Sequence, residues 1–368
     1  MDFNLTDEQE LLRDTTREVL SRTYDIETRN RVVEAEPGFT RQVWEQLAGI
    51  GILGLGFDPA EAGPIEVMLV QTEVGRTLAP EPIAQAALIP GALVAEAGSD
   101  AQRALLDEVA AGSRLLAFAH TEPGRRDPLA PPATTAARTA DGWVLTGRKH
   151  PVPAGDAADT LLVTAALPDG GAGIFVVDAA AARRTPFRTF DGHRGAQIDL
   201  DATPAEPLGA GGDATAHIER TVIRFQSALC AEAVGVMEQA LRITTEYLNT
   251  RKQFGVPLKT FQALTQRAAD MYVSLELARS MSLYAAMSIA DGRFDPVVAA
   301  RAKLQIGRSG RHIAQESIQM HGGIGVTAEY PISHYAARLT AIEQTLGSSH
   351  DQLHVLIGQL RAYDRVSL

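Results

Sequence analysis

The sequence contains very little cysteine, since Cys230 is the single thiol among 368 residues. One cysteine excludes an internal disulfide and a cysteine-rich zinc site. It lies in the apolar run SALCAEAVGVM, where a small core residue is expected rather than a nucleophile. We expect no metal site, and the composition suits a reducing, cytoplasmic location.

Positive charge and long apolar runs are also scarce. The chain has 34 basic and 45 acidic residues, a net charge of −11, which argues against nucleic-acid binding and against a polybasic membrane patch. No apolar run reaches the roughly 18 residues needed to span a bilayer. The first residues, MDFNLTDEQE, have neither a basic region nor an apolar region, so no signal peptide is expected.

The order of local patterns predicts three parts. Residues 1–113 read as helices, and Thr6 with Gln9 forms a capping-box pattern at the first one. Residues 114–212 hold short, β-branched segments separated by turn residues, which are typical of strands. Residues 213–368 return to longer amphipathic helices. We therefore predict an α+β multidomain fold, with an N-terminal helical domain, a middle β-barrel or sandwich domain and a C-terminal four-helix bundle.

Three stretches are candidates for chemistry, and each also has a plain structural interpretation. In Thr250–Gln262, TRKQFGVPLKTFQ, the planar guanidinium of the arginine suits a pyrophosphate. The alternative interpretation of this stretch is a turn that ends a helix. In Gln319–Pro331, QMHGGIGVTAEYP, paired glycines let backbone amides approach an anion, and the alternative is a helix C-cap. The third stretch, His120–Pro128 or HTEPGRRDP, is otherwise an ordinary polar loop.

In their order along the chain, these stretches resemble the acyl-CoA dehydrogenase family, and the resemblance covers essentially the whole sequence. The matches are TEP, the G-x-K of Gly147–Lys149, RKQFG with Gln262 eight residues after Phe254, and QMHGGIG followed by EYP. The resemblance implies the three-part fold, bound FAD, and oxidation of an acyl-CoA to the 2,3-enoyl-CoA. A glutamate would remove the α-proton while the β-hydride goes to the flavin. An electron-transferring flavoprotein is the implied electron acceptor.

The resemblance also implies that FAD is shared across a subunit interface. In this family the flavin ring lies in one subunit, while the bundle of a neighbour holds the ADP half. Carried over to this sequence, the cofactor-binding residues are Arg251, Phe254, Gln262, Gln319, Gly322 and Gly323.

The sequence departs from the family at the catalytic base. The usual glutamate lies seventeen residues after the glutamate of EYP, and that count from Glu329 reaches Leu346. Leucine cannot take a proton. Some members carry the base ten residues before a glycine equivalent to Gly235, and that position holds Phe225. No catalytic residue therefore stands at either expected position.

A displaced base is the alternative. Glu343 is the weak candidate, about one helical turn before Leu346, and His350 is the next one. A solvated charge on a helix face is the other interpretation of Glu343.

The β part departs as well. After TEPG, the family has a small Ala-Gly-Ser-Asp turn, whereas Arg125–Pro128 reads Arg-Arg-Asp-Pro. After GRK, the family has Trp-Ile-Thr against the flavin, whereas Pro151–Pro153 reads Pro-Val-Pro. Proline offers neither an N–H nor an aromatic face. We therefore expect a degraded flavin pocket in this chain's own β domain.

Three interpretations follow. In the first interpretation, this chain resembles the atypical, base-lacking subunit of heteromeric bacterial members of the family. Such a subunit completes the FAD site of a related subunit that has an intact base, in a heterotetramer. Such an assembly leaves room for a bulky or steroid-derived acyl-CoA. The second is an active homo-oligomeric dehydrogenase that uses Glu343. The third is a redox-inactive CoA-thioester or flavin binding protein, or a structural partner.

Overall fold

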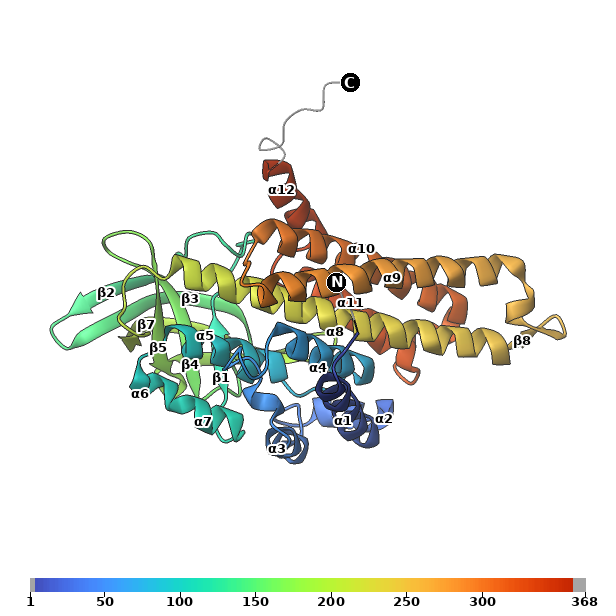
Figure 1. Ribbon diagram of the computed structural model, residues 1–368, viewed down its shortest axis with the longest axis horizontal. Coiled ribbons are helices and arrows are strands. Elements are labelled where there is room, and N and C mark those ends of the chain that lie inside the picture. The colour runs from blue at the N-terminus through green and yellow to red at the C-terminus, as the bar shows by residue number, and fades with distance from the viewer. Residues whose placement is uncertain (1–3, 360–368) are drawn as a thin grey trace, which may run out of the picture. The chain divides into compact units, whose positions relative to one another are not determined.

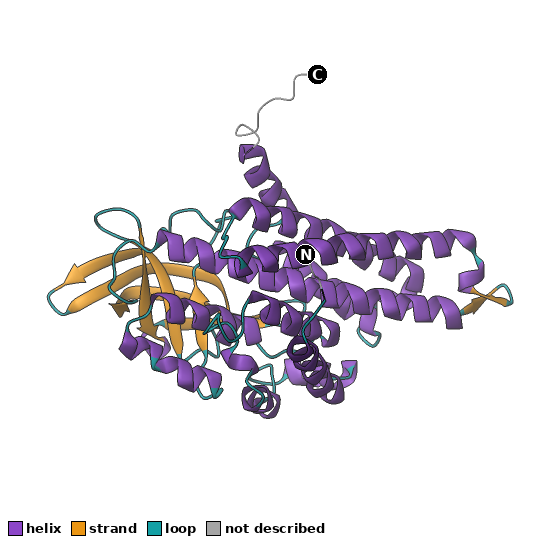
Figure 2. Cartoon of the chain, viewed as in Figure 1, coloured by secondary structure: helices purple, strands orange, loops and turns teal. Residues whose placement is uncertain are grey.

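The structure, a computed structural model, describes residues 4–359, and its chain forms helices, then strands, then helices again (Figures 1 and 2). This order confirms the predicted fold class. Contacts divide the chain into two compact units. The bundle unit combines Met1–Arg29, Met68–Ala79 and Gln226–Leu368, and the β unit combines Asn30–Val67 and Pro80–Phe225. The boundaries at 113 and 212 stay a prediction.

The N-terminal third is helical. Helix α1 (Asp7–Thr23) begins at the predicted capping box, in which the Gln9 backbone N–H donates to the Thr6 hydroxyl at 3.2 Å and the Gln9 side chain accepts from the Thr6 N–H. This box satisfies two backbone donors that the helix itself leaves unpaired. The further helices are α2 (Ile26–Glu34), α3 (Arg41–Gly49), α4 (Pro64–Thr77), the π-helical turn Ala84–Leu88, α5 (Ile89–Ala97), α6 (Asp100–Arg103) and α7 (Leu105–Ala110).

The middle of the chain is a closed β-barrel. Its strands are β1 (Leu116–Ala119), β2 (Thr135–Thr139), β3 (Gly142–Pro153), β4 (Thr160–Ala166), β5 (Ala172–Asp178), β6 (Arg183–Arg188) and β7 (Arg194–Pro207). Strands β4, β2, β3, β7 and β5 pair in a ring, because β5 pairs with both β7 and β4. Strand β1 adds to β4 in parallel, and β6 adds to β7. Leu145, Val163, Phe175 and Ile198 fill the interior.

The C-terminal part is built from long helices. They are α8 (Thr215–Thr250), α9 (Gln262–Ala290), α10 (Pro296–His321), α11 (Pro331–Gln344) and α12 (Ser349–Gln359). A small hairpin, β8 (Lys252–Gln253) and β9 (Val256–Pro257), connects α8 to α9 at one end of the bundle (Figure 1). Asp295 caps α10 by accepting from the Val297 N–H at 2.8 Å, and Pro296 occupies the first helical position.

Helices α4 and α8 touch through their backbones. A Cβ atom on Gly75 would lie 1.9 Å from the Glu232 carbonyl oxygen, and one on Gly235 would lie 1.8 Å from that of Thr72. Neither distance is sterically possible. The two glycines therefore allow a helix crossing that side chains would prevent.

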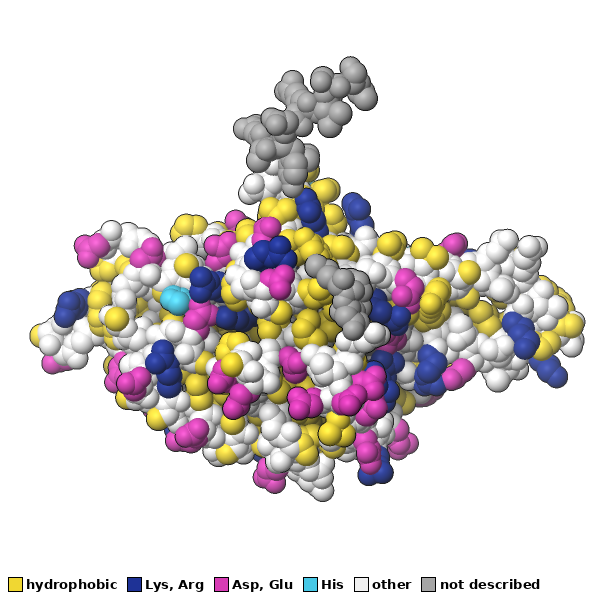
Figure 3. Space-filling view, viewed as in Figure 1, with side chains coloured by type: hydrophobic (Ala, Val, Ile, Leu, Met, Phe, Trp, Pro, Cys, Tyr) yellow, Lys and Arg dark blue, Asp and Glu magenta, His cyan; other side chains and the backbone are white. Residues whose placement is uncertain are grey.

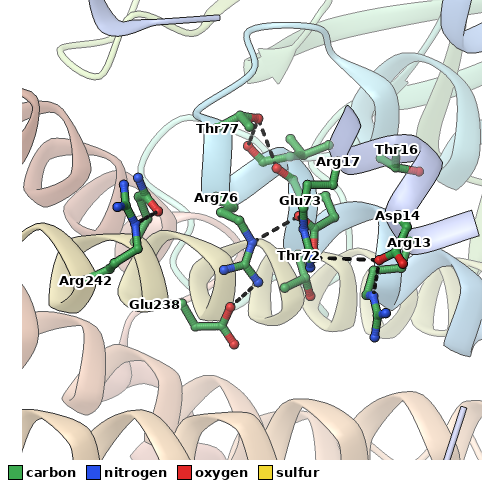
Figure 4. Close-up of polar contacts among 12 residues, drawn as sticks. Arg13, Asp14, Thr16, Arg17, Thr72, Glu73, Arg76, Thr77, Glu238 and Arg242 are labelled. Carbon is green, nitrogen blue, oxygen red and sulfur yellow. Dashed lines mark hydrogen bonds and ion pairs between the residues drawn. The ribbon is translucent and has the colours of Figure 1, made fainter. Parts of the chain in front are cut away.

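Beside this crossing, charged side chains connect four helices of the bundle unit, and Figure 4 shows the contacts among α1, α4 and α8. Glu73 is buried on α4 and accepts hydrogen bonds from Arg17 of α1, at 2.8 and 3.0 Å, and from Arg76, at 3.0 Å. Arg76 also pairs with Glu238 of α8, which in turn accepts from Arg279 of α9 at 2.6 Å. The buried carboxylate of Glu73 is thereby satisfied on both sides.

The Gly235→Ala variant tests the crossing. We expect it to lower the free energy of unfolding by at least about 2 kcal/mol, because the added methyl group meets backbone atoms that cannot rotate away. Urea denaturation followed by circular dichroism measures this change.

Gly358→Ala on α12 is the matched control, because nothing lies within 4 Å of its added Cβ. Alanine is the better helix former, so the control should be neutral or slightly stabilising. Equal stability of the two variants would contradict the close crossing.

Candidate cofactor site and the turn of the missing base

Leu346 lies in the turn between α11 and α12, in the left-handed backbone region with φ 55°. This conformation is uncommon for a branched side chain. Two side-chain amides donate to the Leu346 carbonyl oxygen, that of Gln226 at 2.8 Å and that of Gln352 at 3.2 Å. The turn that should carry the base is thus held from α8 and from α12.

Glu343, the candidate displaced base, holds the same turn. One carboxylate oxygen accepts from the Ser349 N–H at 3.0 Å and from Arg311 at 3.2 Å, and the other accepts from the Ser349 hydroxyl at 2.9 Å. Its side chain is buried, so the interpretation as a solvated surface charge is wrong. Gly307 provides the space, since a Cβ there would lie 2.0 Å from the carboxylate. Glu343 caps the start of α12.

A buried lysine adds to this packing. Lys303 donates to the Ile342 carbonyl oxygen at 2.7 Å, and burial lowers the pKa of its ammonium. Nearby Cys230 is fully buried, and burial raises the pKa of its thiol to about 12. Cys230 is therefore a protonated core residue, in agreement with the expectation from the sequence.

The second family position for a base also lacks a carboxylate. Phe225 is buried, and its neighbour Arg224 pairs with Glu96 at 2.6 Å. The same glutamate accepts from Arg220 at 2.7 Å. Here α8 presents an apolar ring and arginines that are already paired.

The hairpin after α8 presents Phe254 to solvent. Phe254 and Gly255 form its two-residue loop with φ 54° and 85°, the backbone of a type I′ turn, which usually takes Asn-Gly. The Phe254 side chain is 92% exposed, and its only ring neighbour in the described chain is Phe261, at 6.2 Å. A strained and exposed aromatic residue at a loop tip indicates a binding role.

An aromatic cluster brings the first two sequence stretches to the same end of the bundle. Tyr247, in the last turn of α8, lies 4.4 Å from His321, the last residue of α10, and His321 lies 5.1 Å from Tyr330. The candidate cofactor residues lie around this end. Those exposed to solvent are Arg251, Phe254, Gln262, Gln319, Gly322 and Gly323.

The paired glycines leave open space for a ligand. Gly322 ends α10 with φ 65°, and a Cβ on Gly322 or Gly323 would meet nothing within 4 Å. Next to them, the buried His321 donates from Nδ1 to the Ser317 carbonyl oxygen at 2.7 Å, and burial lowers its pKa. Its buried Nε2 has no hydrogen-bond partner in the described residues, so this nitrogen can accept a hydrogen bond.

In the β unit, the TEP and G-x-K matches are joined by a buried ion pair. Lys149 donates to Glu122 at 2.7 Å, to Thr164 at 3.1 Å and to the His120 carbonyl oxygen at 3.2 Å. Gly147 is required beside it, because with φ 152° a Cβ would lie 2.7 Å from the Thr134 Cα. The two motifs together fix the loop between β1 and β2.

The charges of this pair are set by opposing effects. Burial by itself raises the pKa of Glu122, but hydrogen bonds from Lys149 and from the Thr134 and Ala133 N–H groups lower it to about 2. Burial lowers the pKa of Lys149 to about 8 and that of His120 to about 4. At neutral pH the pair is ionised and His120 is uncharged.

The loop fixed by this pair carries Arg125 and Arg126, both exposed. Arg125 lies 3.5 Å from Glu122. At the end of β3, Pro151 is exposed and Pro153 is half-buried. Large charged side chains and prolines thus stand where the family resemblance implies small residues and an aromatic ring.

Sequence reasoning missed the residues that hold the turn. Gln226 and Gln352 carry no local signal, because their bonds to Leu346 span distant parts of the sequence. Ser349 carried the one usable local signal, because serine is a common residue at the start of a helix.

Among the described residues, no helix is long and apolar enough to cross a membrane.

Comparisons with known proteins agree with this geometry. The acyl-CoA dehydrogenase N-terminal domain matches residues 6–113, and the C-terminal domain matches residues 221–359. The fold and these matches define an FAD-linked oxidoreductase of the class that acts on CH–CH bonds. The chain belongs to the acyl-CoA dehydrogenase family.

Three relatives are informative. A variant of the Tcur3481–Tcur3483 steroid ACAD is 34% identical, covers 97% of this chain and 99% of its own, and has a TM-score of 0.89. The ChsE4–ChsE5 complex from Mycobacterium tuberculosis is 26% identical, with 99% and 100% coverage and a TM-score of 0.89. Acyl-CoA dehydrogenase fadE12 of Mycobacterium bovis is 30% identical over 80% of this chain and 81% of its own.

The Lys149→Met variant tests the buried pair. We expect it to lower the free energy of unfolding by about 3–5 kcal/mol, because it removes the buried ammonium that donates to the Glu122 carboxylate. Chemical denaturation at pH 7 measures the loss.

Arg148→Met, one residue earlier, is the control. Arg148 is half-exposed and pairs with Asp199 at the surface, so its loss should cost no more than about 1 kcal/mol. A Lys149→Met variant as stable as this control would show that the pair contributes little.

Proposed function

We propose that this chain is the non-catalytic subunit of a heteromeric FAD-dependent acyl-CoA dehydrogenase. The observation that carries the proposal is the turn at Leu346, where a leucine replaces the base and three side chains hold the backbone in place. The partner would be a related subunit with an intact base. Together they would dehydrogenate an acyl-CoA and pass electrons to an electron-transferring flavoprotein.

The ADP half of FAD fits the exposed end of the bundle. Arg251 would bind the pyrophosphate through its planar fork. Phe254 would offer an aromatic face, and the open backbone at Gly322 and Gly323 would let amides approach closely. Gln262 and Gln319 would supply polar contacts. When bound, FAD supplies the hydride acceptor of the reaction.

The flavin ring does not fit this chain's own β unit equally well. Arg125 and Arg126 occupy the turn that should be small, and Pro151 and Pro153 give no N–H and no aromatic face. Residues that would hold a neighbour's cofactor are therefore kept, while those for the chain's own flavin and base are replaced. This asymmetry supports one FAD per pair of unlike subunits, shared across their interface.

Surface composition and the relatives support a partner subunit. Helix α9 exposes Tyr272, Val273, Leu277 and Tyr284, and Figure 3 shows hydrophobic side chains on the visible surface over this helix. Such apolar area commonly marks a protein interface. The names of the two similar solved structures each join two proteins, and one is a steroid ACAD. By extension from these two structures, we propose that this chain forms a heterotetramer with its partner. We also propose that the substrate carries a bulky or steroid-derived acyl group.

The alternatives have less support. An active homo-oligomer would need Glu343 as its base, yet both of its oxygens already accept hydrogen bonds from Ser349 and Arg311. A redox-inactive binding or structural protein would not need the arginine and the open glycines of the bundle.

FAD content is the first test. We expect little FAD in the chain expressed alone and about one FAD per pair with its partner. In the assembled pair, Arg251→Ala should lower FAD retention about tenfold or more, through loss of a charge-assisted contact. Absorbance after gel filtration measures this.

Lys252→Ala, at the neighbouring exposed position, is the control and should retain FAD. Unchanged FAD in Arg251→Ala would count against the shared site. One FAD per chain in the protein alone would show that its β unit binds flavin after all.

Activity of the assembled pair separates the base candidates. Glu343→Gln should leave turnover within about threefold of wild type, because glutamine keeps the side-chain length and one acceptor oxygen. Leu346→Glu should add no activity, since the flavin contacts of the β unit are replaced too. Stopped-flow flavin reduction measures both. Loss of turnover in Glu343→Gln in a stable pair would identify a displaced base.

A further inference from the structure

Helix α12 carries two histidines on its exposed side, His350 and His354. They stand at positions i and i+4, so they share one face of the helix. Their Nε2 atoms lie 3.0 Å apart, and their ring planes are 88° to each other with centroids 4.5 Å apart. The two Nε2 atoms are therefore within hydrogen-bond distance of each other on an exposed helix face.

This spacing matches two neighbouring ligands of one transition-metal ion. A metal–imidazole bond is about 2.0–2.1 Å long, so two such bonds at a right angle place their nitrogens about 2.9 Å apart. Two histidines at i and i+4 are also the ligand pair of helical zinc motifs. The observed 3.0 Å between the two Nε2 atoms is close to this value.

We propose that His350 and His354 bind a divalent transition-metal ion of the kind that prefers imidazole, such as Cu²⁺ or Ni²⁺. Right-angled nitrogen ligands favour the square-planar or tetragonal geometry of these ions. No group of three or more His, Cys, Asp or Glu side chains among the described residues could hold a metal. The site is therefore bidentate, and water completes the coordination.

The carboxylate of the acidic residue between the two histidines is already engaged. Asp351 lies between them in sequence, but its carboxylate accepts from the Ser348 N–H at 2.9 Å and from the Ser348 hydroxyl at 2.6 Å. Without metal, one imidazole N–H donates to the other nitrogen. To bind a metal through Nε2, that imidazole must carry its proton on Nδ1 instead, so the hydrogen bond and the metal exclude each other. Protons also compete with a metal for imidazole nitrogens, so affinity falls as the pH falls.

The site would connect to the turn of the missing base. Helix α12 begins at Ser349, which Glu343 caps, and Gln352 on the same helix holds the Leu346 carbonyl. A metal across the first turn of α12 would stabilise that turn of helix. The metal site itself does not depend on the proposed function.

Isothermal titration of the full chain with NiCl₂ and CuCl₂ tests the proposal. The protein is purified through a tag without histidine and treated with a chelator first. We expect one ion per chain with a Kd below about 100 μM at pH 7.5, weaker binding at pH 5.5, and no binding of Mg²⁺, which prefers oxygen ligands. The electron paramagnetic resonance spectrum of the Cu²⁺ form should show two coordinated imidazole nitrogens.

Three variants decide the site. His350→Gln and His354→Gln should each weaken binding at least about tenfold, and His312→Gln, which removes a lone imidazole from the bundle unit, should not. Circular dichroism checks that every variant is folded. A wild-type Kd above about 100 μM, or loss of binding in only one of the two paired variants, would overturn the proposal.

Discussion

The backbone contact between α4 and α8 is the constraint on which the bundle unit depends. Gly75 and Gly235 bring the two helices closer than side chains allow, and this contact fixes the position of α8 along its length. Helix α8 then presents Gln226 to the turn at Leu346 and, at its far end, the hairpin with Arg251. One crossing therefore positions both parts of the candidate site.

Much of this arrangement could be predicted from local sequence. Short, β-branched segments predicted the strands of residues 114–212, and residue counting from Glu329 identified Leu346 as the position of the missing base. Strands β6 and β7 have weak local signals, because Pro186 lies within β6 and because small and charged residues interrupt the alternation of β7. These strands are specified by their neighbours in the barrel rather than by their own residues.

The interactions that decide the chemistry could not be predicted locally. The Glu122–Lys149 pair and the amides on Leu346 join residues far apart in sequence, and single-sequence patterns contain no information about such partners. Family resemblance identified TEP and G-x-K as motifs, and the structure explains them as two halves of one buried ion pair. Resemblance also identified the lost base, whereas the structure shows that Glu343, once a candidate to replace it, caps a helix.

The strained tip at Phe254 has a consequence for assembly. A phenylalanine in a left-handed turn, almost fully exposed, has an unfavourable backbone, and Phe261 is its one ring neighbour among the described residues. The hairpin is nevertheless already folded into its presenting shape. Preorganisation of this kind lowers the entropy lost on association. In the proposed assembly, the backbone strain that costs stability in this chain alone would favour binding to a neighbour that covers the ring.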